Sequence, residues 1–445
     1  MAWVRLFLSA HLLVIPFVIL SSMYAHHNNN EFEYTNNDEP PITVAYAISL
    51  IKCGDRQSNA AGMTDAALVL RHSIHKMHEK SKYNYKMYAI VHPKAEECSH
   101  LLKDAGFEVL VRDQPIYPHE IQGELLRKNI NKEWCCGSAE FIKLYAYDLP
   151  EPLFVHMDID FVLHRPMDEL FDVLLDVQSP SKHLIPLERP NDPWPADGVE
   201  AFLTRDWGQN RPGPRPPGYQ AGLLVGRRKP ELIPEIVSVI REGNYSAGYG
   251  MDAGWGGKGY GVFVGAMAMQ GLLAYFYDHV RQGKTMELNQ CRYNHMGMDT
   301  LYRAPPNFHK GHAGVGKCRN GKESCEDCQT TPLEDIYSIH YTQCRKPWNC
   351  IGEPKRNESE SKNIPADSVI VDHCLELQRV WHNHRRDLEE QLIQSGAETV
   401  RESQTGEYKD YWFKGHCKEN GGKGYLTIGG SEREAALRMI PQLYQ

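Results

Sequence analysis

The stretch Leu153-Phe-Val-His-Met-Asp-Ile-Asp-Phe-Val-Leu-His-Arg-Pro166 decides how this chain is interpreted. It begins as an apolar run typical of a buried strand, and two carboxylates follow, Asp158 and Asp160. Side chains two residues apart on an extended strand share one face, so both carboxylates can bind one hard divalent cation. The alternative is a surface turn after a strand, because composition alone gives roughly one chance Asp-x-Asp in a chain this long.

Strand and helix patterns alternate along the chain on both sides of this stretch. We expect strands at 42–50, 85–91, 107–111 and 218–226, and helices at 66–74, 95–105, 139–147, 166–175, 230–241 and 375–393. Such alternation predicts an α/β fold with a mostly parallel sheet and helices on its faces. Ligands of these sheets bind beyond the carboxyl ends of the strands, where Asp158 and Asp160 lie.

Two stretches rich in proline or glycine interrupt the pattern. We expect 187–218 to be a loop that faces a substrate, and 248–261, with its seven glycines, to be a mobile or backbone-dense loop. A histidine- and glycine-rich segment at 309–317 is expected to be an ordered loop. We find no internal repeat.

The two ends of the chain differ from its middle. Residues 6–24 carry no charge at neutral pH, which predicts a signal peptide or signal-anchor within 1–25. We assign 26–41 to a flexible stem, 42–355 to the domain that holds the site, and 356–445 to a charged C-terminal extension. Either N-terminal alternative places the protein in the secretory lumen: the Golgi as a single-pass type II membrane protein, or secreted if cleaved.

The cysteines and the charge agree with that compartment. The chain has 12 cysteines and two glycosylation acceptors, Asn244 and Asn357. Cys325-Glu-Asp-Cys328 offers half a zinc site, but no second pair with matching spacing follows, so we expect disulfides in a Cys-rich, irregular C-terminal extension. The net charge of −8 argues against a nucleic-acid partner.

A distant segment supplies the third expected metal ligand. Ile336-Tyr-Ser-Ile-His-Tyr-Thr-Gln-Cys-Arg-Lys-Pro-Trp348 reads as a short strand that runs into a bend. Its His340 would complete a site with the two aspartates, and an imidazole suits Mn²⁺ better than Mg²⁺. Such an arrangement suits an enzyme that presents a metal to a diphosphate, and Lys346, six residues after His340, would neutralise the charge that builds on that group as it departs. Taken alone, His340 would be a half-buried strand histidine.

These motifs together resemble those of family-8 glycosyltransferases of the GT-A fold, which include glycogenin and plant glucuronosyltransferases. Over residues 42 to 350 the order of the expected strands and helices resembles that of the family, but only the motifs are specific to it. It implies a Rossmann-like nucleotide-sugar-binding fold in which Asp158, Asp160 and His340 bind Mn²⁺ and Lys346 binds the diphosphate of UDP.

Four further positions follow from the same resemblance. Lys143, in Phe141-Ile-Lys-Leu-Tyr, matches a lysine that contacts the nucleotide sugar, and Gln220-Ala-Gly222 stands where the family has Asn-x-Gly beside the donor sugar. Gln270 matches the glutamine of an Asp-Gln-Gly segment, but Met269 replaces its aspartate. The residues implied to bind the donor are Lys143, Asp158, Asp160, Gln220, Gly222, Gln270, His340 and Lys346, with catalytic roles for Lys346 and Gln270.

The resemblance implies a retaining transferase that moves a sugar from a UDP-sugar to a glycan, glycoprotein or glycolipid acceptor. Because Met269 offers no carboxylate nucleophile, we favour front-face displacement over a covalent intermediate. Gln343, which replaces a family glycine, alters the backbone approach to phosphate. Two alternatives stay open: a catalytically inactive lumenal protein of the same fold that binds a glycan or partner, and a nucleotide-sugar hydrolase. The sequence names neither sugar nor acceptor.

Overall fold

The computed structural model describes residues 40–53, 57–132, 137–206, 217–248, 252–261, 263–297, 326–344, 346–348, 373–397, 400 and 425–444. Residues from Pro41 onward form one compact unit. The predicted signal or anchor segment, most of the stem, the 309–317 loop and Asn357 lie outside the described residues. Within the described ranges no helix has both the length and the apolar character needed to cross a membrane.

The strands and helices follow the predicted alternation. The strands are β1 (Thr43–Leu50), β2 (Asn84–Val91), β3 (Glu108–Val111), β4 (Leu153–Met157), β5 (Phe161–Leu163), β6 (Ala201–Arg205), β7 (Tyr219–Arg227), β8 (Tyr245–Ser246), β9 (Gly254–Trp255), β10 (Thr285–Glu287) and β11 (Ser338–His340). The α-helices are α2 (Gln57–His78), α3 (His100–Asp104), α4 (Glu124–Asn129), α5 (Asp168–Leu175), α6 (Leu232–Glu242), α7 (Met269–Tyr275), α9 (His373–Gln394) and α11 (Arg433–Met439). The 3₁₀ helices are η1 (Pro93–Cys98), η2 (Pro118–Glu120), η3 (Ile130–Lys132), η4 (Ser138–Asp148), η5 (Pro180–Leu184), η7 (Cys328–Thr330), η8 (Leu333–Asp335), η9 (Gly430–Glu432) and η10 (Ile440–Tyr444), and η6 (Phe276–Val280) is π-helical.

A seven-stranded sheet in the order β10-β6-β7-β4-β1-β2-β3 forms the centre of the protein. The pairs β1–β2, β1–β4, β2–β3 and β6–β10 are parallel, and β7 runs antiparallel to both β4 and β6. This confirms the predicted α/β fold with a mostly parallel sheet. All five residues of β4 are buried, as expected for an apolar strand covered on both faces.

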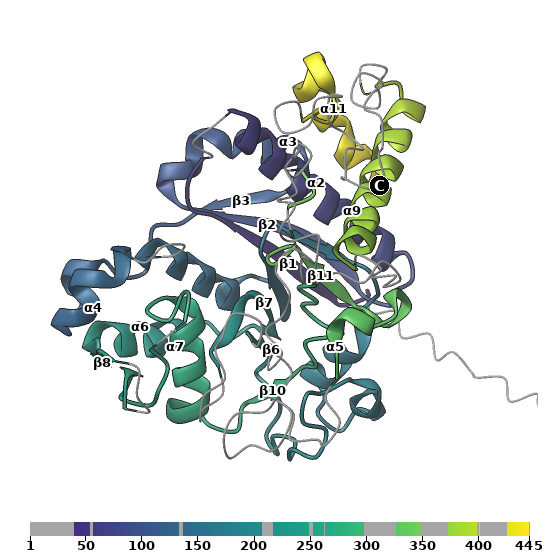
Figure 1. Ribbon diagram of the computed structural model, residues 1–445. Helices are drawn as coiled ribbons and strands as arrows, with labels where there is room; N and C mark the ends of the chain where they lie inside the picture. Colours follow the sequence, from purple (N-terminus) through teal and green to yellow (C-terminus); the bar gives the residue numbers. More distant parts are fainter. Residues whose placement is uncertain are drawn as a thin grey trace, which may run out of the picture. The chain divides into compact units, whose positions relative to one another are not determined.

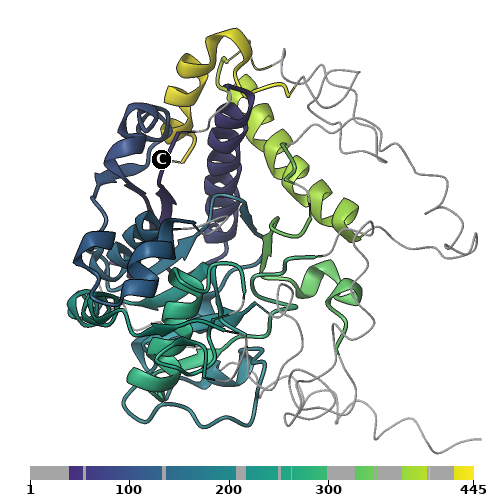
Figure 2. The same cartoon turned by 60° about the vertical axis from the view of Figure 1, so that its left-hand side comes forward.

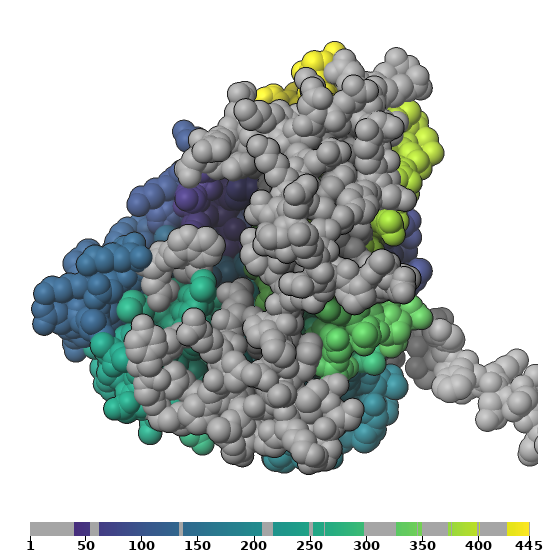
Figure 3. Space-filling view, viewed as in Figure 1, coloured from purple at the N-terminus to yellow at the C-terminus, as the bar shows by residue number. Residues whose placement is uncertain are grey.

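Helices cover both faces of the sheet, and the alternation of side chains along β1 shows how. Val44, Tyr46 and Ile48 pack into one core with α2, α5 and α9, while Ala45 and Ala47 pack into a second core with η4, α6 and α7. Figure 1 shows these two groups of helices on opposite sides of the strands. In the space-filling view of Figure 3, the segments around α4 and α6 adjoin at the surface as blue and teal areas.

The described part of the C-terminal extension is helical and packs on the α2 face of the sheet. Trp381 of α9 and Leu437 of α11 are fully buried in the same core as α2. Figure 2 shows α9 beside α2, with the yellow C-terminal helices near one end of both. Asp65 of α2 anchors this contact, since it accepts hydrogen bonds from the Tyr425 hydroxyl at 2.8 Å and the Ile428 N–H at 3.0 Å.

Disulfides join described cysteines as Cys53–Cys98, Cys291–Cys328 and Cys344–Cys374. The preference for disulfides over zinc is therefore confirmed at Cys328, while Cys325 lies outside the described residues. The Cys344–Cys374 bond ties α9 to the chain just after β11, so the extension is covalently linked close to the predicted site.

Three local expectations need correction. The predicted loop at 187–218 contains the buried strand β6, because its short apolar run pairs with both β7 and β10. The helix expected at 139–147 is the 3₁₀ helix η4, and the helix expected at 95–105 divides at Ser99 into η1 and α3.

The predicted loop at 248–261 contains strand β9, which pairs with β8, and a Cβ on Gly254 would lie 2.1 Å from the Tyr260 backbone. That stretch is backbone-dense, as predicted.

Candidate active site

Strand pairing brings the three predicted metal ligands to one place. Asp158 directly follows β4, and Asp160 directly precedes β5. Strand β11 lies antiparallel to β5 with His340 opposite Phe161, and the Tyr341 N–H donates to the Asp160 carbonyl at 2.9 Å. A distant segment therefore places an imidazole beside the aspartate pair.

The ligand atoms of these side chains converge. One ligand atom from each of Asp158, Asp160 and His340 lies within 4.8 Å of the others. The His340 Nε2 is 3.4 Å from Asp160 Oδ1, and its ring stacks on Phe161 with centroids 4.1 Å apart. Asp160 and His340 are buried, whereas the Asp158 side chain is 31% exposed, so the cluster opens on the Asp158 side.

A buried asparagine sets the tautomer of His340. Asn294, which has a left-handed φ of 56°, donates through Nδ2 to Thr204 Oγ1 at 2.7 Å and to Gln220 Oε1 at 3.5 Å. Its Oδ1 is therefore the acceptor for the His340 Nδ1–H at 2.9 Å. That bond leaves the Nε2 lone pair pointing to the aspartates, as a metal-binding histidine requires.

We predict that Asn294→Gly weakens the affinity of the cluster for a divalent cation by about 10- to 100-fold, because the His340 ring loses the acceptor that fixes its tautomer. Glycine accepts the left-handed backbone, so the variant tests the amide without adding strain. Asn294→Asp keeps an acceptor oxygen for His340 and should retain most of the affinity. Titration of the protein with Mn²⁺, followed by electron paramagnetic resonance of the free ion, measures both. Equal affinities in the wild type and the glycine variant would contradict the role.

Two lysines neutralise the carboxylates. The Lys143 ammonium lies 2.9 Å from both Asp158 Oδ1 and Glu140 Oε1, and Lys346 forms an ion pair with Asp160. Burial opposes the charge on Lys143, but Asp158 and Glu140 outweigh it and raise the pKa of the ammonium above its usual value. Burial likewise would raise the pKa of Asp160, yet Lys346 and His340 hold that pKa well below its ordinary range. Asp158 and Asp160 therefore each form an ion pair with a lysine.

Gly222 keeps the centre of the site open. A Cβ at this position would lie 2.6 Å from Gln220 Oε1, 2.7 Å from His340 Cε1 and 3.0 Å from Asp158 Oδ2. The Gly222 carbonyl accepts from the Asp158 N–H at 2.9 Å, and its N–H donates to Gln220 Oε1 at 2.5 Å. Gln220 therefore shapes the strand beside the aspartates through its amide oxygen.

The segment around Gln270 joins the site through a carboxylate that sequence reasoning missed. Glu140 Oε2 accepts from the Met269 N–H at 3.4 Å, while its other oxygen holds Lys143. A carboxylate thus lies beside position 269 although the residue there is methionine. Gln270 is buried, and its Oε1 has no hydrogen-bond partner among the described residues. The Nε2 of Gln343 likewise has no such partner among them.

A buried histidine in β4 supports the strand behind the aspartates. His156 is 1% exposed, and its Nε2 lies 2.8 Å from the Ser49 hydroxyl. Burial and the nearby Lys143 lower the pKa of His156 to about 3, although Asp158 opposes the shift. The ring is therefore neutral in the folded protein at ordinary pH.

This histidine predicts a loss of stability in acid. Unfolded His156 takes up a proton near pH 6.5 while the folded ring does not, so the free energy of unfolding falls as pH drops from about 6.5 toward 3. Its share by pH 5 is about 2 kcal/mol. Urea unfolding at pH 7.5 and pH 5 should show this loss in the wild type and a smaller one in His156→Gln. Parallel pH profiles would refute the assignment.

The sequence patterns that could have predicted Glu140, Asn294 and Thr204 as residues of the site are weak. Glu140 precedes Lys143 by three residues, a spacing that places both on one helical face, but an exposed surface pair has the same spacing. Asn294 belongs to an irregular segment that lies beside β11, where His295 forms a parallel bridge with Ile339. Thr204 belongs to β6, which we expected to be a loop.

Comparisons with known proteins give fold neighbours only. No protein-family model and no curated protein matches the chain. Among solved structures, mouse xyloside xylosyltransferase 1 is 13% identical with a TM-score of 0.37, covering 69% of this chain and 99% of its own. The galactosyltransferase LgtC, crystallised with donor and acceptor sugar analogues, is 13% identical with a TM-score of 0.37, covering 69% and 89%. The glycosyltransferase GlyE of Streptococcus pneumoniae is 12% identical with a TM-score of 0.38, covering 78% and 60%.

These three neighbours are glycosyltransferases, the class that the motifs resemble. At such TM-scores the likeness assigns neither a family nor a substrate to this chain. Function has to be inferred from the side chains of the site.

Proposed function

We propose that this protein is a retaining glycosyltransferase that moves a sugar from a UDP-sugar to a glycan, glycoprotein or glycolipid acceptor, with Mn²⁺ as cofactor. The observation that carries the proposal is the convergence of Asp158, Asp160 and His340 at the carboxyl end of β4. Two lysines beside this cluster suit a ligand that brings several negative charges.

The residues present fit a divalent cation. Two carboxylates and one imidazole form a donor set suited to Mn²⁺, and Gly222 leaves the space that a side chain would fill. The hydrogen bond from His340 to Asn294 directs the other ring nitrogen toward the aspartates. A bound Mn²⁺ would act as a Lewis acid that offsets negative charge on the diphosphate.

Protein groups would bind and orient the donor around that charge. Lys346 pairs with Asp160 and has a 32% exposed side chain, so it would bind a diphosphate held at the cluster and neutralise that group as it leaves. Lys143 would hold Asp158 and contact the nucleotide sugar. Gln220 and Gly222 would line the donor sugar, and the unpartnered Oε1 of Gln270 would accept a hydrogen bond from a sugar hydroxyl.

We favour front-face displacement for the transfer. The bond between the anomeric carbon and the diphosphate oxygen breaks, the acceptor hydroxyl oxygen bonds to the same face of that carbon, and its proton passes to the departing diphosphate. Glu140 is held by Lys143 and the Met269 N–H, so we assign it to positioning rather than to nucleophilic attack.

Glu140→Gln should lower turnover and Mn²⁺ affinity by about tenfold, because Lys143 then has Asp158 as its remaining carboxylate partner and neutralises it more fully. Glu124→Gln is the matched control, since Glu124 pairs with Lys128 on the exposed helix α4. Initial rates and Mn²⁺ titrations of both variants provide the measurement. Similar losses in the two variants would remove the positioning role.

Isothermal titration with UDP, with and without Mn²⁺, tests the proposed function. We expect UDP binding that depends on the metal, followed by UDP release from one member of a panel of UDP-sugars when an acceptor is present. Absence of metal-dependent UDP binding would overturn the proposal. Binding without turnover would favour the catalytically inactive alternative, and UDP release without any acceptor would favour the hydrolase.

We further propose a place in the secretory pathway, in the Golgi lumen if the N-terminal segment is retained as an anchor. The disulfides among the described residues suit an oxidising compartment, and Asn244 of the first glycosylation acceptor is exposed. Sensitivity of the expressed protein to a glycosidase that removes N-linked glycans would test this placement.

A further inference from the structure

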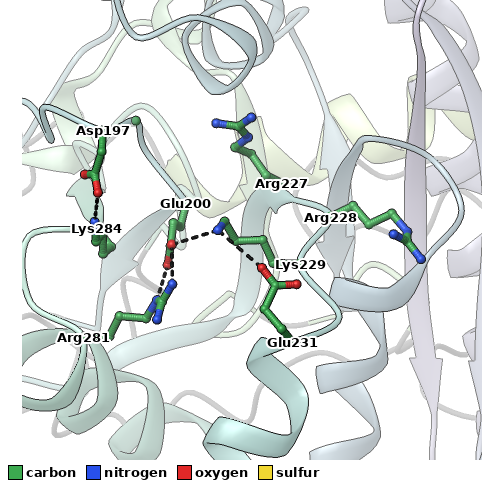
Figure 4. A pocket seen from close by; sticks show the side chains of 9 residues that line it. Asp197, Glu200, Arg227, Arg228, Lys229, Glu231, Arg281 and Lys284 are labelled. Carbon is green, nitrogen blue, oxygen red and sulfur yellow. Dashed lines mark hydrogen bonds and ion pairs between the residues drawn. The ribbon is translucent and has the colours of Figure 1, made fainter.

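A second cavity lies at the opposite end of the strands that carry the candidate active site. Arg227, at the end of β7, pairs with Leu153 at the start of β4, whereas Asp158 follows the end of β4. Five residues of extended strand separate the two ends by about 17 Å. The cavity has a volume of about 340 Å³ and is lined mainly by charged residues (Figure 4).

Cationic side chains outnumber carboxylates in the lining of this cavity. Five lining side chains are cationic, and three are carboxylates; the cations are Arg227, Arg228, Lys229, Arg281 and Lys284. Glu235 and Asp148 lie outside the lining but pair with Arg281 and Arg228, so Arg227 is the lining cation without a carboxylate partner among the described residues.

Some of these cations are held by the protein itself. The guanidinium of Arg281 makes two bonds to the buried Glu200, at 2.6 and 2.8 Å, and a third to Glu235 at 3.1 Å. Lys229 lies 3.2 Å from the same Glu200. Figure 4 shows Glu200 between Lys229 and Arg281, so one buried carboxylate holds both cations.

Other cations remain available to a ligand. Arg227 has no carboxylate partner among the described residues, and its Nη1 lies 3.2 Å from where a Cβ on Gly198 would be. Gly198, with φ of 98°, thus leaves room for the guanidinium. Lys284 pairs with Asp197, whose side chain is 69% exposed, and such a solvated pair is weak enough for Lys284 to bind a ligand instead.

We propose that this cavity binds an anionic sugar, meaning a sugar ring that carries a carboxylate or a phosphate. The planar fork of Arg227 matches either group, and Lys284 adds a second cation in the same lining. The volume lies at the lower end of the range of about 300–1,000 Å³ for small-molecule pockets, and the charged lining disfavours an apolar ligand. The site is separate from the proposed donor site. It would take an acidic unit of a glycan or a free sugar phosphate; the anionic group follows from the cations of the lining, and the choice of a sugar to carry it rests on the proposed function.

Titration calorimetry of the full chain with glucuronic acid, glucose 6-phosphate and neutral glucose tests the proposal. We expect saturable binding of at least one acidic sugar and none of glucose, with affinity about tenfold lower in Arg227→Gln. Tighter binding of glucuronic acid would indicate the glycan source, and tighter binding of glucose 6-phosphate the sugar phosphate.

Arg228→Gln is the matched control. Arg228 is the next residue, but it bonds to the Leu149 carbonyl at 2.9 Å and to Asp148 at 3.3 Å and is directed away from Glu200 in Figure 4. Its loss should leave binding unchanged, while Lys284→Gln should weaken binding as a second test. Asp160→Asn should also leave it unchanged, which separates this site from the proposed function. No saturable binding of either acidic sugar, or equal losses in Arg227→Gln and Arg228→Gln, would overturn the proposal.

Discussion

Asp160→Asn should lower sugar transfer by about a thousandfold or more while the protein stays folded. The substitution removes one of two carboxylate ligands of the candidate metal site, and the metal supplies the main charge stabilisation in the proposed step. Asparagine has the same shape, so it fills the same buried space between His340 and Lys346. UDP binding in the presence of Mn²⁺ should fall together with activity. UDP binding measured without Mn²⁺ should be the same as in the wild type.

The fold of this variant needs its own measurement, because Asp160 is only 8% exposed. Removing its charge leaves Lys346 without that partner, but Lys346 has a 32% exposed side chain and can be solvated. We therefore expect a change of a few degrees at most in the melting temperature. Asp176→Asn, at an exposed position directly after helix α5, is the control for carboxylate loss and should keep full activity. Full transfer activity in Asp160→Asn would eliminate the metal assignment.

The sequence located the aspartate pair and His340 because each lies in a short motif with a local signal. Strand β4 is apolar throughout, so its end could be placed, and the two carboxylates follow it directly. The distant His340 is predicted from the ligand chemistry of an imidazole in a segment that ends in Lys-Pro-Trp, and the resemblance implies the same role. Its position beside Asp160 depends on the antiparallel pairing of β5 with β11, and three-residue strands give almost no periodic signal.

Residues that act on these ligands were harder to find. Asn294 and Glu140 reach the site only through tertiary contacts, to His340 and to Lys143 respectively. Position 269 shows most clearly what a sequence comparison misses. The resemblance leads us to expect an aspartate there, and the residue is methionine. Glu140, from another segment, nevertheless places a carboxylate at the Met269 N–H. A one-dimensional comparison aligns positions and cannot detect such a replacement in space.

Gly222→Ala should abolish Mn²⁺-dependent UDP binding, with a loss of at least about a hundredfold in metal affinity. The added methyl group would meet His340 Cε1 at 2.7 Å and Asp158 Oδ2 at 3.0 Å, so the two ligands would have to move apart. Manganese titration and UDP calorimetry measure the loss. We also expect a cost of about 1–3 kcal/mol in the free energy of unfolding, because the position is tightly packed.

Gly226→Ala separates the two effects, because it places the same methyl group on the same face of β7, four residues further along. There the Cβ would meet the ring of Phe154 at 2.8 Å and the Glu200 carbonyl at 3.1 Å, both remote from the metal ligands. Both variants should therefore lose similar stability in urea, yet only Gly222→Ala should lose metal affinity. If both lost affinity equally, the effect would come from general destabilisation of β7, and the glycine would have no specific place in the site. Loss confined to Gly222→Ala would mean that the space beside Asp158 and His340 is needed by the bound ion.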